Sequence, residues 1–165
     1  MLKRESKIKI WLGVILSVGI GLTTLVSGFA ADNKGMVGWE LNSPYNKLYK
    51  ANEMDSFKGT VVDIKEVSPM PGMSPGLVIE VSESKGETTT VHLCPVSFEG
   101  KKGIRIKKGD RVKVSGSWAE INGKDIFMGS KVSKDEYQFK VRLTKDGTPF
   151  WTMTPAQLAK ERQDQ

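Results

Sequence analysis

From Phe57 onward the chain consists of short runs rich in β-branched residues, and turn residues separate one run from the next. The clearest turn is Asn122-Gly123, which lies between two runs in which apolar and polar residues alternate. Asn-Gly between alternating runs is the strongest short-range signal for a β-hairpin. Several short strands with turn signals between them are typical of an all-β sandwich or barrel. We therefore expect a small all-β domain.

Five main strands are expected, and a further strand pair follows them. The five runs are FKGTVVDIKEV, LVIEVSE, ETTTVHL, GDRVKVSGSW and KDIFMGSKV, and the added C-terminal hairpin consists of YQFKVRLT and TPFWTM. An irregular segment at 94–109 separates the third strand from the fourth. This arrangement favours an OB-like Greek-key barrel, and the alternative is an unrelated sandwich of five or six strands.

The beginning of the chain predicts attachment to a membrane. Residues 1–9 are basic, and residues 10–31 carry no charge, a run long enough for a helix to cross a bilayer, which takes about 20 residues. The alternative is a cleaved signal peptide, for which the Gly-Phe-Ala sequence at 28–30 offers a cleavage site. The length of the run favours a retained anchor. Under both hypotheses the basic flank stays cytoplasmic and the rest of the chain is exported.

The expected parts are a cytoplasmic basic flank at 1–9, a transmembrane helix at 10–31, a linker at 32–56, the β-domain at 57–153 and a polar tail at 154–165. Within the linker, Trp39, Tyr45 and Tyr49 are expected to pack onto the domain, because three exposed aromatic residues in a free tether are unusual. The alternative is an aromatic cluster at the membrane interface, where Trp and Tyr are also favoured. Pro155 after a Thr154 cap predicts a short helix in the tail.

Four side chains form a candidate soft-ligand set: Met70, Met73, His92 and Cys94. His92 and Cys94 are two residues apart, so they are expected to point to the same side of a strand. Thioether, thiolate and imidazole ligands suit Cu(I), an iron centre or a haem axial position. The alternative is that these residues only pack, with the loop methionines closing the barrel mouth. We assign no cofactor and keep copper, iron or haem as the minor hypothesis.

The protein has a formal net charge of +6, and its one charge concentration lies at 101–113. The basic residues of this segment are Lys101, Lys102, Arg105, Lys107, Lys108, Arg111 and Lys113. Closely spaced cations create a local positive potential that attracts phosphates, anionic headgroups or an acidic protein. The alternative is a solvated loop and strand edge, where lysines discourage pairing with other strands.

Catalysis and nucleic-acid binding find little support in the composition. The chain has one histidine and one cysteine, so a nucleophile has only His92 as an imidazole base, and no intrachain disulfide can form. Barrels of the OB type bind single strands with aromatic side chains on the second and third strands, and the runs expected there have none. We expect a protein that is not an enzyme and has no nucleic-acid partner.

Five segments together carry a family resemblance: SPYNKLY, KGTVVDIKEVSPMPGMSPGLVIEV, VHLCPVSF, KKGDRVKVSGS and TKDGTPFW. They lie between residues 43 and 151 and resemble the MamS family of magnetosome proteins, small membrane-anchored OB-like bacterial proteins. The resemblance also implies a glycine where Cys94 stands, which counts against Cys94 as a required ligand.

The resemblance implies a single-pass magnetosome-membrane protein that supports the growth, size and shape of magnetite crystals in biomineralisation. Its N-terminus is then cytoplasmic, and its β-domain lies in the vesicle lumen or periplasm. Iron prefers oxygen ligands, and the chain has no long acidic run, so we expect an accessory role. The expected partners are other magnetosome membrane proteins, including an iron-redox component. The alternatives are an exported ligand-binding or metal-binding module of a periplasmic redox or stress system, and a scaffold that only contacts membrane proteins.

Overall fold

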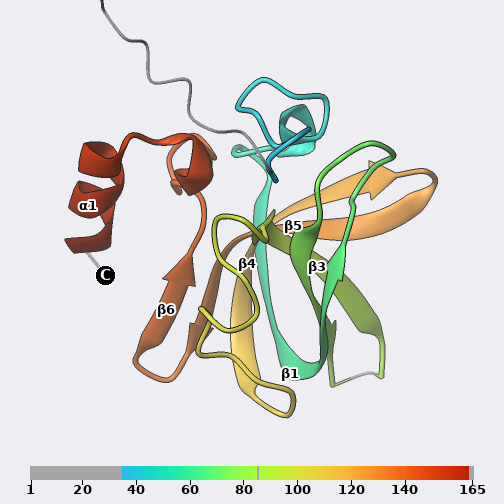
Figure 1. The fold of residues 1–165 in the computed structure, drawn as a ribbon. Helices are drawn as coiled ribbons and strands as arrows, with labels where there is room; N and C mark the ends of the chain where they lie inside the picture. The colour runs from blue at the N-terminus through green and yellow to red at the C-terminus, as the bar shows by residue number, and fades with distance from the viewer. Residues whose placement is uncertain (1–34, 85, 164–165) are drawn as a thin grey trace, which may run out of the picture. The chain divides into compact units, whose positions relative to one another are not determined.

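The computed structural model of the protein describes residues 35–84 and 86–163. Strands form at the β-branched runs, and turns separate them. The six strands are β1 (Met54–Val67), β2 (Gly76–Ser82), β3 (Thr88–Pro95), β4 (Arg111–Ile121), β5 (Lys124–Lys134) and β6 (Tyr137–Lys140). The helices are the 3-10 turns η1 (Asn46–Leu48) and η2 (Phe150–Thr152), and α1 (Pro155–Gln163). The described part of the protein is thus mostly β (Figure 1).

One parallel pairing closes the sheet. The strand order is β3-β2-β1-β4-β5-β6 with antiparallel neighbours, and β3 additionally pairs with β5 in parallel. This pairing joins Val91 to Phe127 and His92 to Met128. The first five strands therefore form a closed ring, and β6 extends the sheet beyond β5 (Figure 1).

The inside of the ring is filled by side chains that alternate along each strand with outward-facing residues. The fully buried members include Val61, Ile79, Val81, Val91, Val114, Phe127 and Val132. Burial of one such side chain stabilises the fold by roughly 1.5–3 kcal/mol. Gly116 allows β4 and β5 to approach closely, because a Cβ there would collide with the Met128 carbonyl. Packing against β-branched and aromatic residues thus explains why these runs form strands.

Aromatic residues before β1 belong to the same core. Trp39 and Tyr45 are each 1% exposed, and their rings meet edge to face with centroids 4.8 Å apart. The Trp39 indole N–H donates to the Ser74 carbonyl at 2.9 Å, and the Trp151 indole N–H donates to the Trp39 carbonyl at 2.7 Å. The aromatic residues expected to dock therefore join the start of the domain to its end.

Arg142 is buried among these aromatic residues and is only 3% exposed. Its Nη2 donates to Asn46 Oδ1 at 2.7 Å, and its Nη1 donates to the Gly147 carbonyl at 3.3 Å. The guanidinium lies 4.8 Å from the ring centroids of both Tyr49 and Trp151. Burial lowers the pKa of Arg142 to about 10, so the group remains charged at neutral pH. This arginine clamps the segment around η1 to the segment before η2.

The prediction of a second strand in the C-terminal hairpin is wrong. β6 pairs with β5, and beyond it the chain forms a single bridge between Arg142 and Pro149. Proline has no N–H to extend a strand ladder, and the following residues turn into η2 instead. There Phe150 and Trp151 are buried, which favours the 3-10 turn over an exposed strand.

The polar tail forms α1, which begins directly after Thr154. The Gln157 N–H donates to Thr154 Oγ1 at 3.3 Å, and the Thr154 N–H donates to Gln157 Oε1 at 2.9 Å. This reciprocal pair is a capping box, which satisfies backbone donors at the start of a helix. Local side-chain chemistry therefore places the helix where the sequence predicts it.

Residues 35–84 and 86–163 contain no helix that is both long and apolar enough to cross a membrane. The predicted transmembrane helix at 10–31 and its basic flank at 1–9 lie outside the described residues. Both stay predictions.

Replacing the clamp should destabilise the domain strongly. Arg142→Ala leaves Asn46 Oδ1 and the Gly147 carbonyl without their donors, so we expect a loss of about 3 kcal/mol in the free energy of unfolding, measured in urea. Arg105→Ala is the matched control, because Arg105 also lies over an aromatic ring, that of Tyr137, but is exposed. The control should lose less than about 1 kcal/mol. Equal losses in the two variants would contradict the clamp.

Candidate functional site

A cleft of about 370 Å³ lies over β1, β2 and β3, and the β4–β5 turn forms its other wall. Its lining combines charged and polar side chains with apolar ones: Lys65, Val67, Ser68, Pro69, Val78, Glu80, Thr90, His92, Ile121, Asn122, Lys124, Asp125 and Ile126. The Asn122-Gly123 turn has positive φ at both residues, which fits the predicted hairpin and fixes this wall. Of the four predicted soft ligands, only His92 lines the cleft.

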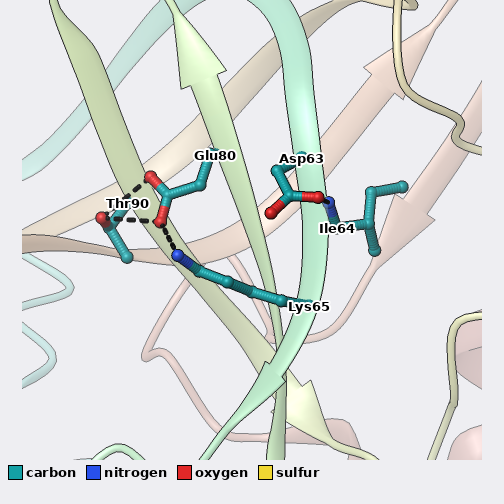
Figure 2. Close-up of polar contacts among 5 residues, drawn as sticks. All are labelled: Asp63, Ile64, Lys65, Glu80 and Thr90. Atoms are coloured by element: carbon teal, nitrogen blue, oxygen red, sulfur yellow. Dashed lines mark hydrogen bonds and ion pairs between the residues drawn. The ribbon is translucent and has the colours of Figure 1, made fainter.

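On the floor of the cleft, the Glu80 carboxylate already has partners on the neighbouring strands (Figure 2). Lys65 Nζ lies 2.6 Å from Glu80 Oε1, and the Thr90 hydroxyl donates to Glu80 Oε2 at 3.0 Å. The nearby Asp63 carboxylate instead accepts the Ile64 N–H at 2.9 Å. Lys65 and Glu80 therefore neutralise one another, and the floor has little net charge.

His92 is a neutral, hydrogen-bonded residue at the edge of this cleft. It is 7% exposed, and burial lowers its pKa to about 4, with the Glu80 carboxylate opposing that shift. Its Nδ1 lies 3.3 Å from the Tyr45 hydroxyl, whose own pKa is raised by burial. The contact fits either neutral tautomer of His92, since the Tyr45 hydroxyl can donate to Nδ1 or accept from it.

His92 and Cys94 lie on opposite faces of the sheet. Leu77 pairs with Cys94, and the next residue, Val78, pairs with His92, so Leu93 is the extra residue of a β-bulge. Directly paired residues share a face, and consecutive residues alternate. Cys94 thus shares the core face of Leu77, while His92 shares the cleft face of Val78. The expectation that both side chains point to the same side is wrong.

Cys94 is a core residue without contact to the cleft. It is fully buried, and its thiol donates to the Glu99 carbonyl with the sulfur 3.7 Å from the oxygen. Burial raises the pKa of the thiol, with the Glu99 carboxylate acting in the same direction. The thiolate is the nucleophilic and metal-binding form of cysteine, and here it is suppressed.

Met70 and Met73 lie in the loop between β1 and β2 and pack against the edge of the core. The Met73 side chain fills the space beside Gly38, where a Cβ would collide with it. The next residue, Ser74, donates its N–H to the Val37 carbonyl at 2.9 Å. Within residues 35–84 and 86–163, no group of three or more His, Cys, Asp or Glu residues is arranged to hold a metal. Met73 thus packs against the segment before β1, and Met70 packs against the core.

The basic segment at 101–113 divides between two surfaces. Ile104 and Ile106 are buried, which anchors the loop and leaves its cations outside. We call these exposed residues the loop cluster: Lys101, Lys102, Arg105, Lys107 and Lys108. Arg111 and Lys113 lie instead on β4 and point outward between buried valines. The segment predicted as one patch is therefore a loop cluster and a separate part of the sheet.

Asp110 separates these two surfaces. Its carboxylate pairs with Lys134 Nζ at 2.8 Å and accepts the Lys107 N–H at 2.7 Å. The contact with Lys134 and, to a lesser extent, the hydrogen bond from the Lys107 N–H hold the pKa of Asp110 below its usual range. The one acid within the segment is thus already engaged and does not neutralise the loop cluster.

Sequence reasoning missed the Lys65–Glu80–Thr90 contacts and the Arg142 clamp. The alternation in LVIEVSE does place Glu80 outward, but only the pairing of β1, β2 and β3 shows which residues meet it. Asn46 and Arg142 are 96 residues apart, so no local pattern reveals their contact.

Comparison with known proteins gives one family match and no curated relative. The model of the MamS/MamX magnetosome protein family matches residues 53–139. No curated protein matches the chain. A solved structure, the dimeric N-terminal domain of PriB protein from Thermoanaerobacter tencongensis, is similar with a TM-score of 0.35 and 18% identity, over 50% of this chain and 96% of that one. At that TM-score the likeness carries no weight for function.

The state of His92 predicts how stability depends on pH. Its pKa is about 4 in the folded protein and 6.5 as the ordinary value, so the unfolded chain binds the proton more tightly. Stability is therefore complete above pH 6.5 and falls as the pH drops towards 4. Between pH 7.5 and 4.5 the unit Asp32–Gln165 should lose about 2–3 kcal/mol, measured by urea unfolding.

His92→Asn is the control, because it keeps a hydrogen-bonding group for the Tyr45 hydroxyl and removes the titrating ring. Asp110 and Asp146 have lowered pKa values and titrate below this window, so they do not obscure it. If the variant loses as much stability as the natural chain over that range, His92 is not the buried neutral residue described here.

Proposed function

The chain belongs to the MamS/MamX magnetosome protein family, whose model covers more than half of it, and we propose that it is a non-enzymatic accessory protein of the magnetosome membrane. It acts in magnetosome biomineralisation and supports the growth, size and shape of magnetite crystals. It does so through contacts with other magnetosome membrane proteins. The family match over residues 53–139 carries this proposal.

The loop cluster is the surface we assign to these protein contacts. Its cations are exposed, and no ion pair within residues 35–84 and 86–163 includes them. The buried side chains of Ile104 and Ile106 hold the loop against the core. Positive charges at the rim of an interface steer an acidic partner and set the association rate. An acidic surface on another magnetosome membrane protein, such as an iron-redox component, is the matching partner.

The environments of Cys94 and His92 support a role without catalysis. The thiol is buried and protonated, the imidazole is neutral, and the bulge at Leu93 sends the two side chains to opposite faces. A nucleophile and its base must lie within hydrogen-bond reach of one another. The bulge also separates His92 from Cys94, two of the four predicted soft ligands, and so does not favour a metal-binding module of a redox system.

Fold and topology complete the proposal. A ring in the order β1-β2-β3-β5-β4 fits an OB-like Greek-key barrel. The uncharged run at 10–31 serves as a single membrane anchor, and the basic flank at 1–9 keeps the N-terminus cytoplasmic. The β-domain then lies in the magnetosome lumen or the periplasm.

Charge reversal of the loop cluster tests the proposed contact. A chain with Lys101→Glu, Lys102→Glu, Lys107→Glu and Lys108→Glu should restore membrane location in a deletion strain but give small or misshapen magnetite crystals. The reason is that the acidic partner is then repelled. Crystal size distributions from electron microscopy and fractionation of the protein provide the two measurements.

The matched control reverses four exposed lysines elsewhere: Lys47→Glu, Lys50→Glu, Lys145→Glu and Lys160→Glu. It changes the net charge equally and should leave crystals normal. Normal crystals in both variants would remove the loop cluster from the mechanism, and defects in both would show an effect of net charge alone.

A further inference from the structure

The register of β1, β4, β5 and β6 gathers cations on one outward face of the sheet. Lys58 pairs with Lys113, which pairs with Ser133, and in the next row Ser115 pairs with Lys131. Arg111 lies two residues before Lys113 and so shares its face. The opposite, inward face carries buried valines and phenylalanines. We call the outward set Lys58, Arg111, Lys113 and Lys131 the cationic face (Figure 1 shows β1 and β4 side by side).

The cationic face contains like charges at directly opposed positions. Lys58 lies directly across from Lys113. Like charges directly opposite one another destabilise an antiparallel pair. No ion pair within residues 35–84 and 86–163 includes Lys58, Lys113 or Lys131. The Lys58–Lys113 pair therefore destabilises the sheet unless an anionic group covers it.

The residues between these cations are hydroxyl and amide side chains, without an acid or an aromatic ring. They are Ser56, Thr60, Ser115, Ser133 and Gln138. Beside Lys58 and Arg111 a hollow of about 270 Å³ is also lined by Thr60, Ser82 and Ser84. The carboxylate at its rim, Glu83, accepts a hydrogen bond from the Thr89 hydroxyl at 3.3 Å. Two cations and three hydroxyls around a shallow hollow match the chemistry of a phosphate headgroup.

We propose that the cationic face docks on an anionic phospholipid surface. A stable protein interface needs an apolar or aromatic centre, which this face lacks. A lipid surface needs only charge, and each basic residue near an anionic leaflet strengthens binding by about five-fold. The cations of this face are complementary to the phosphates of a lipid layer, and the hollow beside Lys58 receives one headgroup.

The length of the chain before the domain supports this occupant. The proposed anchor ends at residue 31, and the described domain begins at Gly35. Four extended residues reach at most about 14 Å, so the domain stays next to the membrane that holds the anchor. This step rests on the membrane attachment proposed above, whereas the lipid contact itself is independent of the loop cluster and its protein partner.

Lysine labelling of the full chain tests the proposal. The chain is reconstituted into vesicles of equal parts phosphatidylglycerol and phosphatidylcholine, or of phosphatidylcholine alone. A membrane-impermeant acetylating reagent is added, and mass spectrometry gives the labelling rate of each lysine relative to exposed Lys145. Lys58, Lys113 and Lys131 should be labelled about five-fold or more slowly in the phosphatidylglycerol vesicles. Molar salt should abolish the difference, while Lys101 and Lys102 should label equally in both vesicles.

A variant gives a second, independent measurement. Lys58→Gln removes one like-charge pair, so it should raise the unfolding temperature in phosphatidylcholine vesicles and also reduce the protection of Lys113 and Lys131 in phosphatidylglycerol vesicles.

Equal labelling of the cationic face in both vesicles overturns the proposal. So does protection of Lys101 and Lys102 in its place, or protection that appears only when magnetosome membrane proteins are added, since the last result identifies an acidic protein as the partner.

Discussion

The parallel pairing of β3 with β5 is the contact on which the rest of the structure depends. By joining Val91 to Phe127 and His92 to Met128, it turns an open sheet into a ring with a distinct inside and outside. The inside holds Cys94 in its protonated form, and the outside carries the cleft, the loop cluster and the cationic face. That division separates the residues that serve the fold from those that can meet a partner.

The Arg142 clamp completes the closed domain at one end of the chain. A buried guanidinium with no carboxylate partner is unusual, and here hydrogen bonds and two aromatic rings take the place of the counter-ion. The clamp holds Trp151 next to Trp39, so residues near both ends of the described chain are fixed to the ring. Among the described residues the buried Nε atom of Arg142 has no hydrogen-bond partner, so Nη1, Nη2 and the two rings make all the contacts of the clamp.

Local patterns predicted the strands, the Asn122-Gly123 turn and the helix after Thr154, because alternation and turn chemistry act between near neighbours in sequence. Local patterns do not predict which distant segments pair with one another. The bulge at Leu93 reversed the expected direction of Cys94. The cationic face was missed for the same reason, since only the register places Lys58 beside the β4 cations.

We propose that this member of the MamS/MamX family acts through its charged outer surfaces, with the buried and soft-ligand residues serving the fold. The most direct test is a chain that lacks all four predicted ligands, with Met70→Leu, Met73→Leu, His92→Asn and Cys94→Ala, expressed in a strain without the natural gene. Magnetite crystals of normal size and shape are predicted, provided that the variant reaches its normal abundance. Small or misshapen crystals at normal abundance would contradict the account.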